Sequence, residues 1–234
     1  MRWQVGTSGF SYDEWVGTFY PEDLPAKERL SYYASKLPAV EINNTFYRMP
    51  KASVLEGWAS QVGEDFRFVL KASQKITHMK RLKPECADET QYLLRTAGTL
   101  GARLGPLLFQ LPPNLKRDLD RLDGFLALLP EGTRAAFEFR HESWRDDEVA
   151  ARLRARNLAL CSADVDDEDE PPVVATADYG YLRLRRTAYD DDALRRWRDR
   201  AIAAGWAEAY LFFKHEDEGT GPRLAGRFLE LARD

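Results

Sequence analysis

The chain has 234 residues, 44% of them hydrophobic, and a formal net charge of −4 at pH 7. This composition supplies enough apolar side chains for a core, which excludes a disordered chain, and the length fits a single domain over residues 1–234. The small acidic charge excludes a globally basic nucleic-acid-binding protein, so any anion site must be a local concentration of Arg and Lys.

Neither a membrane span nor a secretory signal is visible. No run reaches about 18 apolar residues, and residues 1–6 lack a basic-then-apolar pattern. The two cysteines, Cys86 and Cys161, lie far apart and outside any C-x-x-C motif. Free thiols in a reducing compartment are the simplest interpretation, so we expect a cytoplasmic protein without a membrane partner.

Short apolar runs alternate with helical patterns along the chain. In order, the prediction is strand Trp3–Thr7, helix Ala26–Leu37, strand Ala39–Asn43, helix Ala52–Val62, strand Arg67–Lys71, helix Asp88–Gly101, strand Leu104–Leu111, helix Leu119–Leu129, strand Ala135–Arg140, helix Ser143–Arg156, strand Leu158–Ala163, strand Tyr179–Arg185, helix Asp191–Ala204, strand Glu208–Lys214 and helix Pro222–Ala232. After the sixth strand, the acidic stretch 164–172 ends in two prolines and predicts a surface loop in place of a helix. Eight such units predict an α/β fold, a (β/α)₈ TIM-type barrel.

Polar side chains recur on one face of five predicted strands. Because side chains alternate along a strand, the apolar set of each strand is expected under the helices and the polar set inside the barrel. The polar sets lie near the C-terminal strand ends and contain Glu41, Asn43, Lys71, Gln110, Glu138, Arg140, Arg183 and Arg185. In this fold, these ends form the mouth where active sites are built. Ion pairs that only set strand register are the structural alternative, but apolar residues would often stabilise a core better.

This mixed-charge mouth predicts binding of a phosphorylated or otherwise anionic ligand. Guanidinium groups match phosphate and carboxylate oxygens bidentately, and the cations able to approach are Arg48, Lys71, Arg140, Arg183, Arg185 and Lys214. Asn43 and Gln110 are expected to fix orientation, while Tyr47 and Trp144 lie in adjoining loops and can stack on a base or sugar. Hydrolysis or isomerisation by acid–base chemistry is the reaction class we expect.

The catalytic candidates are Glu41, Glu138 and His141. The two carboxylates would orient the cations or act as bases, and His141, with His78 as the other candidate, would carry a proton. A glycosidase-like pair of carboxylates is one alternative, although neighbouring cations would keep both ionised when one must be an acid. A non-catalytic nucleic-acid or protein binding module is another.

No cofactor motif is present, and a catalytic metal is not expected. The three histidines, His78, His141 and His215, follow strand ends but form no His-x-His or His-Glu-x-x-His motif. The cofactor therefore stays unknown, and no metal ligands are assigned.

Five ordered motifs give the chain a family resemblance. They are the stretch 6–12 with Trp15 and 17–21, the stretch 40–48, Lys71 with 76–78, the stretch 104–113, and the stretch 137–144. Together they are similar to the YecE-like family, domain of unknown function 72, over nearly the whole chain. The resemblance implies a TIM-type barrel and no established reaction.

The chain departs from this family pattern late in the sequence. The resemblance implies Arg-Leu-His-Gly on the seventh strand, where this chain has Arg183-Leu184-Arg185-Arg186, and Phe-Asn-Asn on the eighth, where it has Phe213-Lys214-His215. Both changes introduce longer, mostly cationic side chains, so we expect a more basic barrel mouth in this member.

Overall fold

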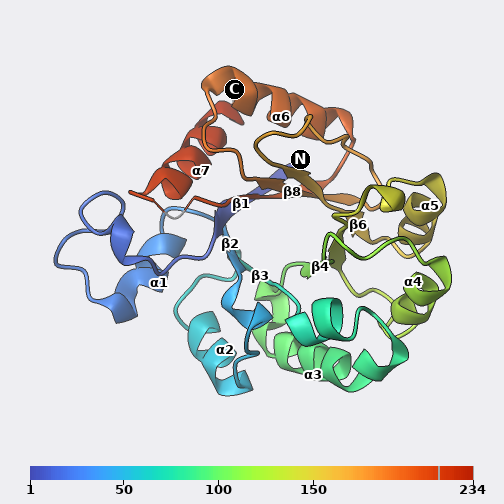
Figure 1. The fold of residues 1–234 in the computed structure, drawn as a ribbon. Coiled ribbons are helices and arrows are strands. Elements are labelled where there is room, and N and C mark those ends of the chain that lie inside the picture. Colours follow the sequence, from blue (N-terminus) through green and yellow to red (C-terminus); the bar gives the residue numbers. More distant parts are fainter. Residues whose placement is uncertain (216, 234) are drawn as a thin grey trace.

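The computed structural model describes residues 1–215 and 217–233. Its strands are β1 (Arg2–Ser8), β2 (Ala39–Ile42), β3 (Arg67–Leu70), β4 (Leu107–Gln110), β5 (Ala135–Glu138), β6 (Ala159–Leu160), β7 (Ser162–Asp164), β8 (Tyr179–Leu184) and β9 (Glu208–Phe213). Its α-helices are α1 (Arg29–Ala34), α2 (Ala52–Ala59), α3 (Ala87–Ala97), α4 (Leu119–Leu126), α5 (Asp147–Ala155), α6 (Asp191–Ala203) and α7 (Thr220–Leu231). The strands lie at the centre and the helices surround them, which confirms the predicted TIM-type barrel (Figure 1).

The recorded strand pairs are parallel and run β3-β2-β1-β9-β8-β7 and β4-β5-β6. Two single bridges, Phe68 to Leu104 and Lys71 to Leu108, join β3 to the β4 segment. The predicted sixth strand is interrupted at Cys161, so that β6 pairs with β5 and β7 pairs with β8. The nine described strands therefore occupy the eight expected positions around the barrel.

No helix lies between β7 and β8 in the described chain, as the acidic stretch predicted. The predicted helix Ser143–Arg156 begins later than expected, at Asp147. A short 3₁₀ turn, Glu142–Trp144, comes first, and the Asp146 carboxylate caps α5 by accepting the Glu148 backbone N–H. An aspartate cap satisfies a backbone donor that the first helical turn leaves unpaired, which explains the later start. The described chain has no helix that is long and apolar enough to cross a membrane.

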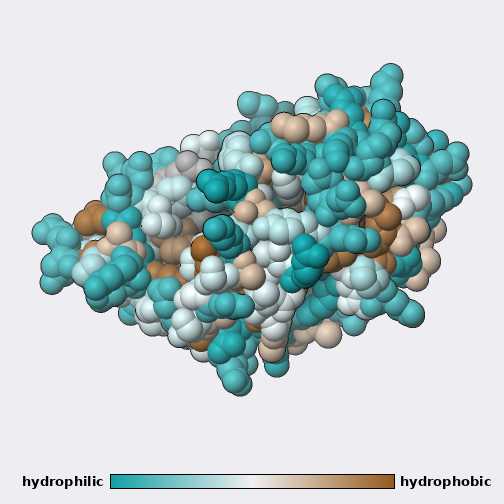
Figure 2. Space-filling model, turned by 90° about the horizontal axis from the view of Figure 1, so that it is seen from below, coloured by the Kyte–Doolittle hydropathy of each residue, from teal (hydrophilic) through white to brown (hydrophobic). Residues whose placement is uncertain are grey.

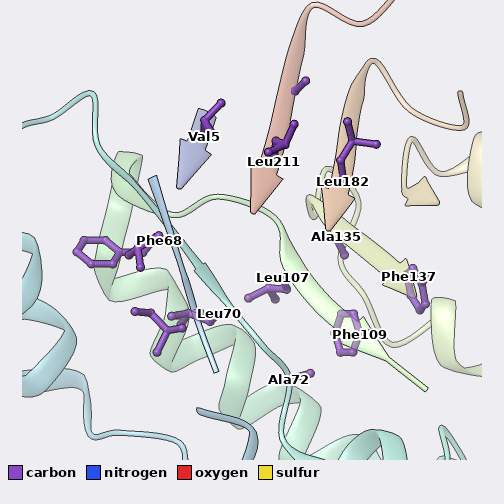
Figure 3. Close-up of a cluster of buried hydrophobic side chains, with 14 of the residues drawn as sticks. Val5, Phe68, Leu70, Ala72, Leu107, Phe109, Ala135, Phe137, Leu182 and Leu211 are labelled. Atoms are coloured by element: carbon purple, nitrogen blue, oxygen red, sulfur yellow. The ribbon is translucent and has the colours of Figure 1, made fainter. Parts of the chain in front are cut away.

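The alternation of side chains separates two cores, as predicted. The outer core fills the space between strands and helices, and Figure 3 shows members on several strands, such as Phe68 on β3, Leu107 on β4 and Leu182 on β8. The inner core combines small side chains with large rings, including Ala136, Tyr181 and Tyr210. The face seen in Figure 2 is mostly hydrophilic, with hydrophobic residues in separate patches. The barrel is thus filled with side chains, and the polar strand ends lie above a packed aromatic layer.

Candidate functional site

Arg183 joins the two carboxylates of the barrel mouth. From the end of β8, its Nη1 donates to Oε2 of Glu138 at 2.6 Å and its Nη2 donates to Oε1 of Glu41 at 2.7 Å. Glu41 is fully buried, and Arg183 and Glu138 are each 2% exposed. Three side chains from β2, β5 and β8 therefore meet inside the barrel, as the alternation predicted.

Glu41 has two further donors that the sequence analysis missed. The Ser8 hydroxyl donates to Oε1 at 2.6 Å, and the Tyr181 hydroxyl donates to Oε2 at 2.6 Å. Tyr181 lies two residues before Arg183 on β8, so the same alternation would have placed it inside. The Glu41 carboxylate is thus fully engaged by buried donors, and it forms the deep base of the network.

Glu138 lies at the centre of the cationic side of the mouth. Its Oε1 accepts from Gln110 Nε2 at 2.8 Å and Arg140 Nε at 3.0 Å, and Arg185 Nη1 lies 3.9 Å away. Burial alone would raise the pKa of Glu138, but Arg183 and Arg140 hold the pKa well below its ordinary value. Glu138 is therefore a permanent anion that supports the surrounding guanidinium groups.

The mouth carries more positive than negative charge. Among the described residues, the cations Lys71, Arg140, Arg183 and Arg185 act on the carboxylates of Glu41 and Glu138. Two buried guanidinium atoms of this network, Nε of Arg183 and Nε of Arg185, have no hydrogen-bond partner among the described residues. Buried polar atoms are normally satisfied, so these atoms indicate a place for a polar ligand or water.

Lys71 differs from the arginines because it forms no ion pair within the described part of the chain. Its Nζ lies 4.4 Å from the centre of the Phe46 ring. Burial and the charge of Arg183 lower the pKa of Lys71 to about 8, against smaller opposing effects of Glu41 and Glu138. A lysine amine that titrates near neutral pH can transfer protons or act as a nucleophile.

A pocket of about 360 Å³ opens beside this network. Glu138, Arg140 and Arg185 line its charged part, and Phe139 and Trp144, stacked with ring centres 4.5 Å apart, line its apolar part. Its other lining residues include Cys161 and part of the acidic loop, namely Val165, Glu168, Pro171 and Pro172. Burial raises the pKa of the Cys161 thiol well above its ordinary value, so this thiol is protonated. The pocket offers guanidinium groups next to a hydrophobic wall.

Not every predicted ligand-binding residue reaches this pocket. Tyr47, which is 71% exposed, and Arg48 line a separate hollow of about 240 Å³ together with Glu89. Lys214 lines another hollow, of about 330 Å³, which Arg185 also borders. Of the predicted ligand-binding residues, Arg140, Trp144 and Arg185 thus line the mouth pocket, and Tyr47, Arg48 and Lys214 line the two other hollows. The linings of these three cavities do not include Asn43, Lys71, Gln110 or Arg183.

The two added arginines of the seventh strand have different environments. Arg185 points into the mouth, whereas Arg186 donates from Nε to Oδ1 of buried Asp164 at 2.6 Å. Tyr189 donates to the other oxygen of Asp164 at 2.8 Å. One end of the acidic stretch thus neutralises Arg186, and only Arg185 adds charge to the mouth.

His141 and His78 also differ in their surroundings. His141 Nδ1 lies 2.9 Å from the Ser143 hydroxyl and accepts the Ser143 backbone N–H, so it organises the turn before α5. His78 packs edge-on against Phe46, with ring centres 4.9 Å apart. Burial and the charges of Lys71 and Arg140 lower the pKa of His78. The catalytic role of His141 stays a prediction. His78 is influenced electrostatically by the cations of the mouth.

No group of three or more His, Cys, Asp or Glu side chains is placed to hold a metal ion in residues 1–215 and 217–233. Gly9 explains part of the opening motif, because its φ of 103° favours glycine and an added Cβ would lie 2.3 Å from the Tyr12 hydroxyl. That hydroxyl donates to the Ser8 carbonyl at 2.7 Å. The motif therefore shapes the chain beside Ser8, one of the donors to Glu41.

Similar structures and sequences support this architecture. A DUF72 family protein of Thermotoga maritima superimposes with a TM-score of 0.88, at 25% identity and with full coverage of both chains. A D-psicose 3-epimerase of Clostridium cellulolyticum H10, solved with D-tagatose, shares the fold alone, with a TM-score of 0.58 and 9% identity over 100% of this chain and 98% of that one.

Among curated sequences, the UPF0759 protein YecE of Escherichia coli K12 is 32% identical over 138 residues, which are 58% of this chain and 48% of YecE. The UPF0759 protein YunF of Bacillus subtilis is 29% identical over 148 residues, 60% of this chain and 51% of YunF. The chain thus spans about half the length of the curated relatives it matches. The family model described as "protein of unknown function DUF72" matches residues 4–234, and the chain belongs to this family.

Proposed function

We propose that the protein binds a small phosphorylated or otherwise anionic molecule in the pocket beside Arg185 and acts on it by acid–base chemistry, as a hydrolase or isomerase. The cationic excess of the mouth supports this proposal, because buried like charges repel each other unless an anion joins them. The adjoining wall of Phe139 and Trp144 suits a ligand with one charged end and one apolar or ring-shaped end.

Arg185 provides the observation that carries the proposal. Its side chain is 19% exposed, it lines the pocket, and its Nε is buried without a partner. Glu138, at 3.9 Å, is its ion-pair partner, and Glu138 already accepts closer hydrogen bonds from other donors. Burial and the charge of Arg183 lower the pKa of Arg185. An anion in the pocket would supply the negative charge and the acceptor that this guanidinium lacks.

The state of Glu138 argues for charge support over general-acid catalysis. A general acid must hold a proton near the working pH, whereas Arg183 and Arg140 keep the pKa of Glu138 well below its ordinary value, although burial opposes them. A glycosidase-like mechanism would therefore lack its acid at this position. Lys71 and His78 are better placed to transfer protons, because burial and neighbouring cations lower the pKa of Lys71 to about 8 and also lower the pKa of His78.

The binding experiment compares Arg185→Gln with Arg195→Gln in isothermal titration calorimetry. Arg195 is a matched control because it lies on the outer helix α6 and pairs there with Asp192. Inorganic phosphate and a panel of phosphorylated and carboxylated metabolites serve as probes. Loss of one charge-assisted contact is expected to weaken binding by about 10- to 100-fold in Arg185→Gln and to leave Arg195→Gln unchanged.

A salt titration with long DNA and RNA strands separates this proposal from a binding module. Tight strand binding with a steep salt slope, and no response to any small anion, would overturn the proposal in favour of a nucleic-acid module. Two of the large aromatic side chains give that alternative little surface, since Trp15 is fully buried and Trp144 is 2% exposed, whereas Tyr47 is 71% exposed. We therefore expect weak strand binding that is insensitive to Arg185→Gln.

A further inference from the structure

Lys71 has an environment that differs from that of a salt-bridging lysine. The charges of Glu41, Glu138, Arg140 and Arg183 act on its amine, and the charge of the amine acts in turn on His78. Neither carboxylate forms an ion pair with Lys71 in the described chain, because Arg183 binds both of them. Lys71 does not line the pocket itself, but Glu138 and Arg140, which do, are among the charges that act on its amine, and the amine has no ion-pair partner in the described chain.

From this placement, we infer that Lys71 is a carbonyl-reactive amine that forms an imine with an anionic aldehyde or ketone held in the barrel mouth. The inference rests on the proposed anion binding and specifies the substrate class: a small molecule that carries both a phosphate or carboxylate group and a carbonyl group. The arginines bind the anionic end, and Lys71 reacts with the carbonyl carbon.

The backbone holds Lys71 firmly in this position. Its N–H donates to the Ile42 carbonyl at 3.1 Å, and its carbonyl accepts from the Thr45 hydroxyl at 2.7 Å. The Phe46 ring then supports the end of the side chain, with Nζ 4.4 Å from the ring centre. A fixed amine loses little conformational freedom when it reacts, which favours attack on a bound carbonyl.

The protonation state of the amine fits the reaction. Only the neutral amine is a nucleophile, and burial together with Arg183 lowers the pKa of Lys71 to about 8. At pH 7.5 about a quarter of such amines are neutral, against roughly one in a thousand for an ordinary lysine with a pKa near 10.4. The cation–π contact with Phe46 favours the charged form, so it moderates this effect without supplying a counter-ion.

His78 is placed to assist the proton transfers. His78 and Lys71 pack against the same ring, that of Phe46. The pKa of His78 is lowered by burial and by the charges of Lys71 and Arg140, so its imidazole is neutral at pH 7. A neutral imidazole can accept a proton from the attacking nitrogen and return it to the leaving oxygen.

The reaction balances without an oxidant or a further reactant. The Nζ lone pair attacks the carbonyl carbon and forms the C–N bond, while the π electrons move to the oxygen, which takes up a proton. The nitrogen then loses protons, the C–O bond breaks with release of water, and the C=N bond forms. One amine and one carbonyl group thus give one imine and one water molecule.

Pyridoxal 5′-phosphate is the probe for this inference because it carries both an aldehyde and a phosphate. The protein is incubated with it at pH 7.5, reduced with sodium borohydride and mapped by peptide mass spectrometry. We expect the phosphopyridoxyl group on Lys71, at an occupancy at least about tenfold above that on exposed Lys75, given the difference in neutral amine. The trapping rate should rise between pH 7 and 9 with a midpoint near pH 8.

Two variants and a second ligand complete the design. Lys71→Arg keeps the charge but is expected to lose the label and the absorption band of the imine, while the control Lys75→Arg keeps both. Pyridoxine 5′-phosphate, which has the phosphate but no carbonyl group, measures anion binding alone and should compete with labelling.

The outcomes distinguish the two proposals. If pyridoxine 5′-phosphate binds but Lys71 is labelled no more than Lys75 in the wild-type protein, the imine inference is overturned and the anion site stands. If neither compound binds above the level of Arg185→Gln, both fall. Mapping on the wild-type chain makes the test independent of whether Lys71→Arg folds.

Discussion

The two ends of the barrel interior both contain a charge cluster, but the clusters differ in composition and in burial. At the N-terminal end, Glu208 accepts from Arg134 at 2.8 Å, Gln4 at 3.0 Å and Tyr210 at 3.1 Å. One carboxylate thus faces one cation there. At the C-terminal end, the carboxylates of Glu41 and Glu138 face a larger set of cations, and two guanidinium Nε atoms have no partner.

The cation of the N-terminal cluster, Arg134, also has its charge compensated in more ways than Arg183 does. Arg134 lies over the Tyr179 ring at 4.2 Å and remains 40% exposed, so its charge is solvated as well as paired. Arg183 is 2% exposed and depends entirely on its carboxylates. The two ends thus differ in the burial of their cations and in the balance of charge, and the excess of buried positive charge at the C-terminal end is the feature on which the proposed anion site rests.

Replacing Arg183 by Met is expected to have the largest effect on this comparison. The substitution leaves the carboxylates of Glu41 and Glu138 buried without their shared cation, which is expected to lower the free energy of unfolding by about 3–5 kcal/mol. Urea unfolding followed by circular dichroism measures it. A loss below about 1 kcal/mol would mean that Arg183 contributes no more to stability than the partly exposed pair of Arg134 and Glu208 at the N-terminal end.

Glu138→Gln tests how the stability contributed by the C-terminal cluster depends on pH. At pH 7 we expect a loss of about 2–3 kcal/mol, since a charged acceptor of several buried donors is removed. The folded pKa of Glu138 is lowered by Arg183 and Arg140 despite burial, so its stabilisation is present above the unfolded value of 4.5 and is lost as the pH falls toward the folded value. The difference between wild type and variant should therefore shrink below pH 4.5. A difference in the free energy of unfolding that stays constant down to pH 3 would contradict a lowered pKa of Glu138.

Lys71→Met should act in the opposite direction and at the opposite end of the pH scale. The folded pKa of about 8 lies below the ordinary 10.5, so the charged amine destabilises the fold at neutral pH. We expect the variant to be about 1–3 kcal/mol more stable at pH 7. The folded protein loses this proton at a lower pH than the unfolded chain. The free energy of unfolding of the wild-type protein should therefore rise relative to that of the variant between pH 8 and 10.5. Chemical unfolding at pH 7, 8.5 and 10 measures the trend, and a variant less stable than wild type at pH 7 would contradict it.

The smallest effect is expected at the lower end, for Arg134→Met. The partly exposed pair with Glu208 should contribute about 0.2–1 kcal/mol, and Gln4 and Tyr210 remain as donors to the carboxylate. This variant is the matched partner of Arg183→Met in urea unfolding. Equal losses in the two variants would remove the distinction between the two ends of the barrel.

The barrel and the inward-facing residues could be predicted because both follow from local patterns. Strand–helix alternation and the two-residue period of side chains are enough to predict that Glu41, Glu138 and Arg183 lie inside the barrel. The same rule also places Tyr181 inside, but its apolar ring does not distinguish it in the sequence from an ordinary core residue. Helix starts were less predictable, as the later beginning of α5 shows, because Ser143 and Asp146 are both plausible caps.

What the sequence by itself determined was the fold class, the family and the face on which each strand residue lies, since these depend on spacing along the chain. The tertiary structure decided which charges meet. Closure of the barrel brought Arg183 between two carboxylates and placed Arg185 at the mouth, while Arg186 paired with Asp164. It also left Lys71 without an ion pair among the described residues. The physical reason is that Coulomb and hydrogen-bond energies depend on distances across the barrel, and residues 45 and 142 positions apart become neighbours only when the cylinder closes.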